Sequence, residues 1–191
     1  VDHHTGHAAY SYYSSPIRGK ALVLTADAWG DDLNATVSVV EKGQIKRISS
    51  STNFILGRLY RYITLLLGMK PNEHEYKVMG LAAYSKAQYF QKSLQVFKNT
   101  QFVKGIGFDY KEKPKDLYYY FKDKLDGHRF DAVAGGLQKY TEDLLVDWAK
   151  NSVKKTGINS ICLSGGTAMN VKAAMEINSL NSVKEIFITA S

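Results

Sequence analysis

The sequence predicts an α/β fold with a mixed sheet, and two patterns carry that prediction. Near the N-terminus, Thr36–Val40 and Gln44–Ser49 are strand-like segments joined by the turn pair Lys42-Gly43, which indicates an antiparallel hairpin. Near the C-terminus, a helical segment separates the apolar strands Ser160–Leu163 and Glu185–Thr189. A strand–helix–strand unit of this kind crosses over with a right hand, so we expect these two strands to be parallel. Together the two patterns give a mixed sheet flanked by helices.

Local periodicity and turn residues predict the other elements. The apolar run Ala21–Thr25 is expected to form a strand that ends in the polar turn Asp27–Asp32. The remaining expected elements are helices at Asp2–Tyr13, Phe54–Leu67, Glu75–Tyr84, Ala87–Lys98, Leu117–Lys124 and Phe130–Lys155, irregular backbone at Gly105–Lys115, and a turn and helix at Gly165–Asn178.

The composition is that of a globular protein. The chain has 191 residues, of which 45% are hydrophobic and 12% aromatic, and no apolar run reaches the roughly 18–20 residues of a membrane span. The single cysteine, Cys162, lies in an apolar run, so we expect a soluble protein in a reduced, cytoplasmic setting. The formal charge of +7 is spread along the chain, which disfavours nucleic-acid binding but suits phosphate-bearing small substrates.

The first candidate site is the opening segment His3-His4-Thr5-Gly6-His7. On a helix, His3 and His7 project from one face about one turn apart, which suits a metal such as zinc or iron. Asp27, after the first apolar run, offers a carboxylate that could complete the ligand set. Spacing alone leaves two alternatives open: a chance histidine pattern and a turn-capping aspartate.

The second candidate site is the glycine turn Ser164-Gly165-Gly166-Thr167, which follows a strand and opens a helix. Paired glycines let a phosphate approach the backbone, and the N–H groups of the new helix favour an anion. A plain tight turn is the alternative. Arg58 and Lys77 are further phosphate candidates, with solvated side chains on amphipathic helices as the alternative.

Taken in order, these segments resemble the O-carbamoyltransferases of nodulation-factor and antibiotic biosynthesis, the family that includes nodulation protein U and the cephalosporin and tobramycin carbamoyltransferases. HHTGHAAYSYYSSP is similar to the family pattern HHxxHAxxAxxxSP, and TADAWGDD to its DGxGD turn. ILGRLYRYITLLLG resembles SLGxxYxxxTxxLG, and EYKVMGLAAY resembles EyKVMGLAxYG. LQKYTEDLL and LSGGTAMN resemble LQxxtExxx and LxGGxAxN.

The resemblance implies a fold, a reaction and a set of site residues. The fold is the ribonuclease-H-like fold of actin and the sugar kinases. The reaction uses ATP and carbamoyl phosphate to make carbamoyl-adenylate, whose carbamoyl group passes to a hydroxyl of a small-molecule or sugar acceptor. His3, His7 and Asp27 would hold Fe²⁺ or another divalent metal, and Gly165, Gly166 and Asn170 would contact the nucleotide, with Arg58 and Lys77 near phosphates. His4 would act as a base toward the acceptor or hold the orientation of the cluster.

On this basis we divide the chain into a metal-binding part at 1–84, a variable insertion at 85–127 and a nucleotide-binding part at 128–191. Ala28, Ser85 and the Thr189-Ala190-Ser191 end depart from the family pattern. We also expect the 191 residues to be a fragment, inactive alone, because the opening strands, another metal-binding aspartate and an adenylate-forming domain of the family have no counterpart in them. A homo-oligomer is compatible with the sequence. A phosphotransferase of the same fold and a non-catalytic nucleotide-binding module are the alternative functions.

Overall fold

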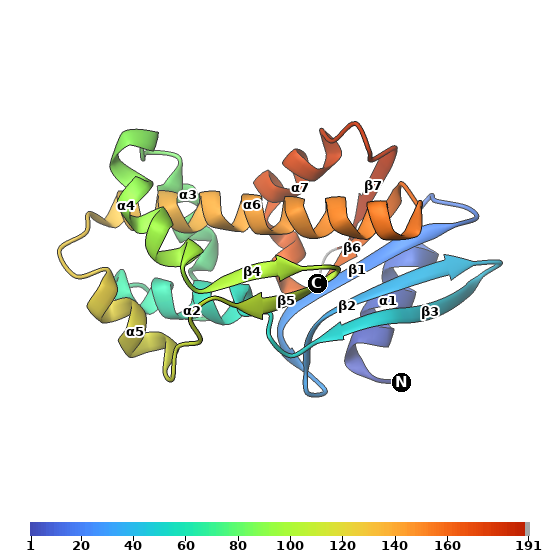
Figure 1. The fold of residues 1–191 in the computed structure, drawn as a ribbon, viewed down its shortest axis with the longest axis horizontal. Coiled ribbons are helices and arrows are strands. Elements are labelled where there is room, and N and C mark those ends of the chain that lie inside the picture. The colour runs from blue at the N-terminus through green and yellow to red at the C-terminus, as the bar shows by residue number, and fades with distance from the viewer. Residues whose placement is uncertain (190–191) are drawn as a thin grey trace. The chain divides into compact units, whose positions relative to one another are not determined.

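The computed structural model describes residues 1–189 and has a five-stranded sheet with the strand order β3-β2-β1-β6-β7 (Figure 1). The strands are Ala21–Gly30 (β1), Leu33–Glu41 (β2), Gln44–Ser51 (β3), Ser160–Ser164 (β6) and Glu185–Ile188 (β7). β1, β2 and β3 pair antiparallel, whereas β1 with β6 and β6 with β7 pair parallel. The predicted hairpin and the predicted parallel pair are therefore both confirmed. Ala190 and Ser191 lie outside the described residues.

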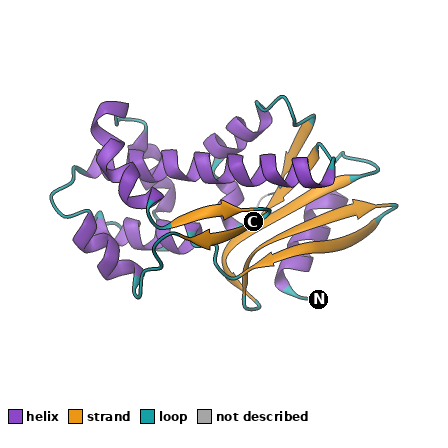
Figure 2. Cartoon of the chain, in the orientation of Figure 1, coloured by secondary structure: helices purple, strands orange, loops and turns teal. Residues whose placement is uncertain are grey.

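Helices account for most of the remaining structure (Figure 2). Their bounds are His3–Ser14 (α1), Leu56–Leu66 (α2), Glu75–Ala82 (α3), Ala87–Lys98 (α4), Leu117–Lys124 (α5), Phe130–Thr156 (α6) and Val171–Asn178 (α7), with a 3₁₀ turn at Gly166–Met169 (η1). Every expected helix is present, with ends that agree with the expected bounds or shift by one or two residues. Within residues 1–189, no helix is both long enough and apolar enough to cross a membrane.

Two strand predictions need correction. β1 continues through Asp27 to Gly30, so the expected polar turn at Asp27–Asp32 is confined to Asp31 and Asp32. The extension exists because β2 supplies a pairing partner as far as Leu33, which local polarity cannot reveal. The segment expected to be irregular contains Gly107–Tyr110 (β5), which forms a two-stranded sheet with Gln101–Lys104 (β4). Strands of four residues are too short to show a clear alternation.

The chain forms two compact units. The first contains Val1–Phe54, Val103–Asp109 and Leu144–Ser191, and the second contains Ile55–Phe102 and Tyr110–Asp143. The three-part division by function remains a prediction, since it concerns variability and binding rather than compactness.

In the first unit, α1 packs on the sheet and builds one core. Ala8 and Tyr12 of α1 contact buried side chains of β1 and β6, including Val23 and Cys162. Residues 21–26 of β1 are all buried, as expected for a central strand covered on both faces. Burial raises the pKa of the Cys162 thiol, so this cysteine is an inert core residue.

In the second unit, α4 and α6 pack closely. Gly136 of α6 leaves no room for a side chain, because a Cβ there would lie 2.7 Å from the backbone nitrogen of Leu94. Phe97 stacks near Tyr140, whose hydroxyl donates a hydrogen bond to the Gln101 carbonyl at 3.0 Å. This unit holds Arg58 and Lys77, whereas the histidine cluster and the glycine turn belong to the first.

Candidate functional site

Helix α1 carries the histidine pair and has a capped N-terminus. The N-cap is Asp2, whose Oδ1 accepts a hydrogen bond from the Thr5 backbone N–H at 3.0 Å. Arg47 of β3 donates to the same carboxylate at 2.6 Å. Hydrogen bonds from Thr5 and Arg47 hold the pKa of Asp2 well below its usual range. The cap therefore fixes the start of the helix that projects His3 and His7 from one face.

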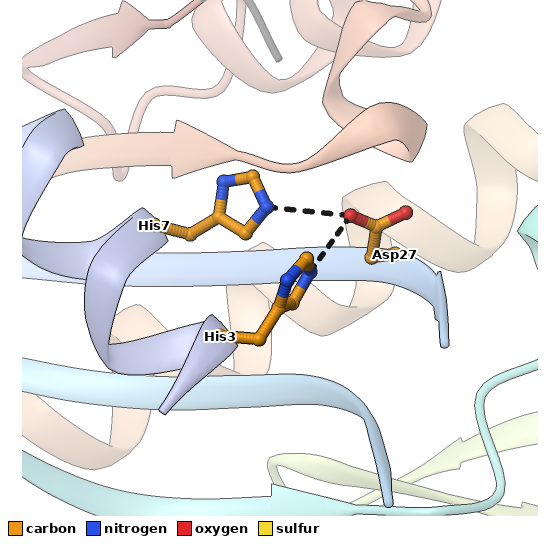
Figure 3. A group of neighbouring side chains, drawn as sticks. All are labelled: His3, His7 and Asp27. Carbon is orange, nitrogen blue, oxygen red and sulfur yellow. Dashed lines mark hydrogen bonds and ion pairs between the residues drawn. The ribbon is translucent and has the colours of Figure 1, made fainter. Parts of the chain in front are cut away.

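Asp27 of β1 faces both histidines (Figure 3). Its Oδ2 lies 3.2 Å from His3 Nε2 and 3.3 Å from His7 Nε2. The three ligand-type atoms all lie within 4.8 Å of one another. The structure thus brings together the three residues that the sequence selected as metal ligands. Their role as ligands remains a prediction.

A bulge in β1 positions Asp27. Between the pairs Ala26↔Ala35 and Gly30↔Leu33, residues 27–29 of β1 lie opposite the single residue Asn34 of β2. The Asn34 amide donates to the Ala28 carbonyl at 2.6 Å, which holds the bulge. The Ala28 N–H donates to Asp27 Oδ1 at 2.7 Å, and the other carboxylate oxygen faces the imidazoles.

The His3 ring packs against Gly30. A Cβ at position 30 would lie 2.1 Å from His3 Cδ2, so any side chain there would displace the ring. The Asp31 carboxylate accepts a hydrogen bond from the His3 backbone N–H. Asp31 and Asp32 have φ of 49° and 61°, which gives a tight hairpin turn of type I′ between β1 and β2. Both aspartates lie in a turn, as expected from the polar segment.

His7 also contacts the end of β6. Its Nδ1 lies 3.2 Å from Ser164 Oγ, and Thr189 donates its hydroxyl hydrogen to the same Oγ at 2.8 Å. Ser164 is 0% exposed and Thr189 4% exposed. The ring is therefore held at both nitrogens, by Asp27 on one side and Ser164 on the other.

His4 is buried against the sheet and is 1% exposed. Its Nδ1 lies 2.7 Å from Thr25 Oγ1, which in turn lies 2.7 Å from Thr36 Oγ1. Burial lowers the pKa of His4. This environment favours a role for His4 in holding the orientation of the cluster over a role as a base. Both roles of His4 remain predictions.

The two glycines of the turn after β6 have different surroundings. Gly165 has φ of +96°, and a Cβ there would lie 2.3 Å from the Ala26 carbonyl oxygen, so the close packing of the turn on β1 requires glycine. Gly166 is exposed, and a Cβ there would lie 3.3 Å from Asp27 Oδ1. The glycine turn therefore borders the metal-type cluster.

Two further residues shape this turn. The Asn170 side chain accepts a hydrogen bond from the Ala173 N–H at 3.0 Å and caps α7. Thr167 is 9% exposed, and in the described part of the chain its hydroxyl oxygen has no hydrogen-bond partner. The nucleotide contacts expected of Gly165, Gly166 and Asn170 remain predictions.

Arg58 and Lys77 belong to the second unit. Arg58 lies half-buried on α2, and Lys77 lies exposed on α3 with its Nζ 5.9 Å from the centre of the Tyr76 ring. Their phosphate contacts also remain predictions.

The geometry of the cluster fits a divalent cation. Ligand atoms about 2.1 Å from a shared ion, at bond angles of about 90–109°, lie about 3.0–3.4 Å apart. The two distances from Asp27 Oδ2, 3.2 and 3.3 Å, fall in that range. Two imidazoles and one carboxylate are also a donor set that suits Fe²⁺ or Zn²⁺. Without an ion, the same distances allow both rings to donate hydrogen bonds to Asp27.

The chain matches a known protein family over its whole length. The family model of the carbamoyltransferase N-terminus matches residues 1–191. The chain belongs to this carbamoyltransferase family.

Relatives of this carbamoyltransferase N-terminal domain are longer proteins. An uncharacterized protein of Methanocaldococcus jannaschii is 30% identical over an alignment of 183 residues that covers 92% of this chain and 35% of that protein. Nodulation protein NolO of Bradyrhizobium diazoefficiens is 26% identical over an alignment of 175 residues that covers 89% of this chain and 32% of NolO. The chain thus spans about a third of the length of the curated relatives it matches.

The fold is shared with a solved structure, full-length HypF in its phosphate- and nucleotide-bound form. The TM-score is 0.56 at 14% sequence identity, over 99% of this chain and 39% of the HypF chain. A likeness at this identity is one of fold. It confirms the expected class, a ribonuclease-H-like, actin-like α/β fold with a mixed sheet flanked by helices.

Three residues of the carbamoyltransferase domain that shape the cluster were not assigned to it from the sequence. Gly30 stands in the acidic motif, but nothing local shows that its missing side chain makes room for His3. Ser164 was expected only as the first residue of the glycine turn, and Thr189 only as the end of a strand. The sheet brings Ser164 to His7, which precedes it by 157 positions, and brings Thr189 to Ser164.

Proposed function

We propose that the protein transfers a carbamoyl group from carbamoyl phosphate to a hydroxyl of a small-molecule or sugar acceptor and consumes ATP through carbamoyl-adenylate. Family membership supports carbamoyl transfer. The observation that carries the proposal is the contact between the two candidate sites. The Cβ position of Gly166 lies 3.3 Å from Asp27 Oδ1, so an anion held at the turn would lie beside the histidine–aspartate cluster.

In this proposal His3, His7 and Asp27 hold a divalent cation such as Fe²⁺. When bound, such an ion polarises phosphate and carbonyl oxygens and offsets their negative charge. The protein side chains keep the ligand atoms in place: Asp2 caps the helix of the histidines, and Asn34 holds the bulge of Asp27.

The glycine turn is the proposed nucleotide contact. Gly166 is exposed and has no side chain, so a phosphate can approach the backbone N–H groups of the turn. HypF, which shares the fold, was solved with phosphate and nucleotide bound, and this supports a nucleotide in the present protein. Arg58 and Lys77, which belong to the second unit, remain separate predicted phosphate contacts.

The reaction balances when one water enters. Water cleaves carbamoyl phosphate to carbamate and phosphate. A carbamate oxygen then displaces pyrophosphate from the α-phosphorus of ATP, which gives carbamoyl-adenylate. The acceptor hydroxyl finally attacks the carbamoyl carbon, and AMP leaves. The acceptor must therefore be a nucleophilic hydroxyl compound, and the proton of its hydroxyl is lost during attack.

The products of ATP test the proposal. In the full-length protein, we expect AMP and pyrophosphate to appear from ATP only when carbamoyl phosphate is added, as measured by chromatography of the nucleotides. His7→Ala should abolish carbamoyl transfer to the acceptor, whereas His74→Ala, which changes a histidine outside the cluster, should not. Formation of ADP with phosphate on the acceptor would instead establish a phosphotransferase. ATP binding without any turnover would establish a non-catalytic module.

A further inference from the structure

The contact between His7 and Ser164 belongs neither to the proposed cation ligands nor to the proposed nucleotide contacts. His7 Nδ1 lies 3.2 Å from Ser164 Oγ, on the side of the ring opposite Asp27. Ser164 is the last residue of β6 and is completely buried, so bulk water does not substitute for its hydroxyl. A buried polar contact of this kind costs free energy if one partner is lost.

The protonation of the ring makes this contact informative. A neutral imidazole carries one proton, so Nε2 can bind a cation only when the proton sits on Nδ1. An Nδ1–H group at this position needs an acceptor, and Ser164 Oγ is at hydrogen-bond distance. In the alternative tautomer, Nε2–H donates to Asp27 Oδ2 at 3.3 Å and Nδ1 accepts from the Ser164 hydroxyl.

A hydroxyl serves both tautomers, because it can accept one hydrogen bond and donate another. A carboxylate at position 164 would accept only, and an alanine would do neither. Serine therefore lets the ring exchange its proton between the two nitrogens without losing its buried partner.

Thr189 keeps the Ser164 hydroxyl in place. Its own hydroxyl donates to Ser164 Oγ at 2.8 Å, and its backbone N–H donates to the Leu163 carbonyl at 3.2 Å. The end of β7 is thus tied to the end of β6 beside the ring. The hydrogen of Thr189 occupies one lone pair of Ser164 Oγ and leaves the other for His7 Nδ1–H.

We propose that Ser164, held by Thr189, is a positioning residue that sets the orientation and tautomer of His7, so that Nε2 can bind a cation beside Asp27. This inference rests on the proposed metal site. It goes beyond that proposal because it assigns the cation affinity partly to a hydroxyl that does not touch the ion.

The first test measures the affinity of the full chain for Zn²⁺ alone by competition with a chromogenic chelator. Ser164→Ala should weaken Zn²⁺ binding about tenfold or more, the size of effect typical of partners behind a metal ligand. Thr189→Val, which keeps the shape of the side chain, should weaken it less. The matched control is Ser160→Ala, because Ser160 lies on the same strand and its hydroxyl donates to Glu185 at 2.7 Å instead of to a histidine.

The second test observes the ring directly. In Zn²⁺-loaded protein labelled with ¹⁵N-histidine, the His7 Nδ1–H should exchange slowly with water in the wild type and clearly faster in Ser164→Ala, as read by NMR. The His3 signals should stay unchanged. A general loss of structure would alter both histidines and is separated from the proposed effect in this way.

The outcomes distinguish this inference from the metal site. Wild-type Zn²⁺ binding that is lost in His7→Ala, together with unchanged affinity and unchanged Nδ1–H exchange in Ser164→Ala, overturns the inference and leaves the metal site standing. Zn²⁺ binding that is insensitive to His7→Ala overturns both. Weaker binding and faster exchange in Ser164→Ala, with normal behaviour of Ser160→Ala, support the positioning role.

Discussion

At the scale of single residues, the absence of a side chain shapes the site as much as the presence of one. His3 occupies the space above Gly30, and the Ala26 carbonyl occupies the space beside Gly165. Gly166, by contrast, is exposed and borders Asp27. The first two glycines are needed for packing, and the third leaves the backbone accessible to a ligand.

Gly30→Ala should weaken cation binding while the protein stays folded. The new methyl group would lie 2.1 Å from His3 Cδ2, so the ring must turn away from Asp27. Loss of one of three ligands should lower Zn²⁺ affinity by about tenfold or more, as measured by chelator competition.

Gly6→Ala is the matched control for this prediction. Gly6 lies between the two histidines on α1, and a Cβ there would meet nothing within 4 Å. This variant should keep the Zn²⁺ affinity and gain about 0.5–1 kcal/mol in free energy of unfolding from the better helix propensity of alanine. Equal Zn²⁺ affinities for Gly30→Ala and the wild type would show that His3 is not a ligand.

The residue scale also shows what the sequence could reveal about the site. His3 and His7 were predicted because helical spacing is a local property, and Asp27 because an acidic residue follows an apolar run. The roles of Ser164 and Thr189 could not be predicted, because the contacts of Ser164 with His7 and of Thr189 with Ser164 depend on the pairing of β1, β6 and β7.

At the scale of elements, local signals predicted the helices well. Asp2 and Asp116 cap α1 and α5 through their side chains, and such caps are visible in a sequence. The full length of β1 was not predicted, because Asp27 and Gly30 are typical of a turn and residues 27–30 form a strand only opposite β2. Asp143 lies near the middle of helix α6.

Asp143→Asn should lower stability at neutral pH but not in acid. Asp143 forms ion pairs with Lys98 of α4 and Lys139 of α6, with a distance of 2.7 Å from each Nζ to a carboxylate oxygen. Burial raises the pKa of this carboxyl, but the hydrogen bonds from the two lysines outweigh burial and hold the pKa below the ordinary 3.8. A lowered folded-state pKa means stability that is present above 3.8 and is lost as the pH falls through the folded value.

We expect a loss of about 1 kcal/mol or less in the free energy of unfolding near neutral pH, measured by urea denaturation. The difference between variant and wild type should shrink on acidification below 3.8 and vanish below the lowered folded-state pKa. In a Lys98→Met background the penalty of Asp143→Asn should shrink, because one of its two partners is gone. A penalty of equal size in acid would mean that packing, not charge, holds Asp143.

At the scale of the whole molecule, a mixed sheet was predictable from the hairpin and the parallel pair, but its strand order was not. The parallel pairing of β1 with β6 brings Leu22 beside Ile161, and no local pattern specifies such a partner. The ribonuclease-H-like class was expected from resemblance to a family rather than from strand pairing. The structure adds the strand order and places the cluster and the glycine turn in one unit.

The placement of the cluster in the chain bears on the order of folding. His3, His7 and Asp27 all lie within the first 27 residues, whereas Ser164 and Thr189 come near the end of the described chain. During synthesis, the ligand side chains can converge once α1 meets the first hairpin, long before β6 exists. A cation captured then would tie α1 to β1 and shorten the search for the native state.

Zn²⁺ should therefore accelerate refolding of the wild type in stopped-flow experiments and have no such effect on His7→Ala. Ser164→Ala should refold with the same acceleration but lose the ion faster once native, because its missing hydroxyl acts only after β6 has docked. Slower unfolding without faster refolding would show that the cluster closes after the rate-limiting step. The cation would then stabilise the completed sheet without accelerating its formation.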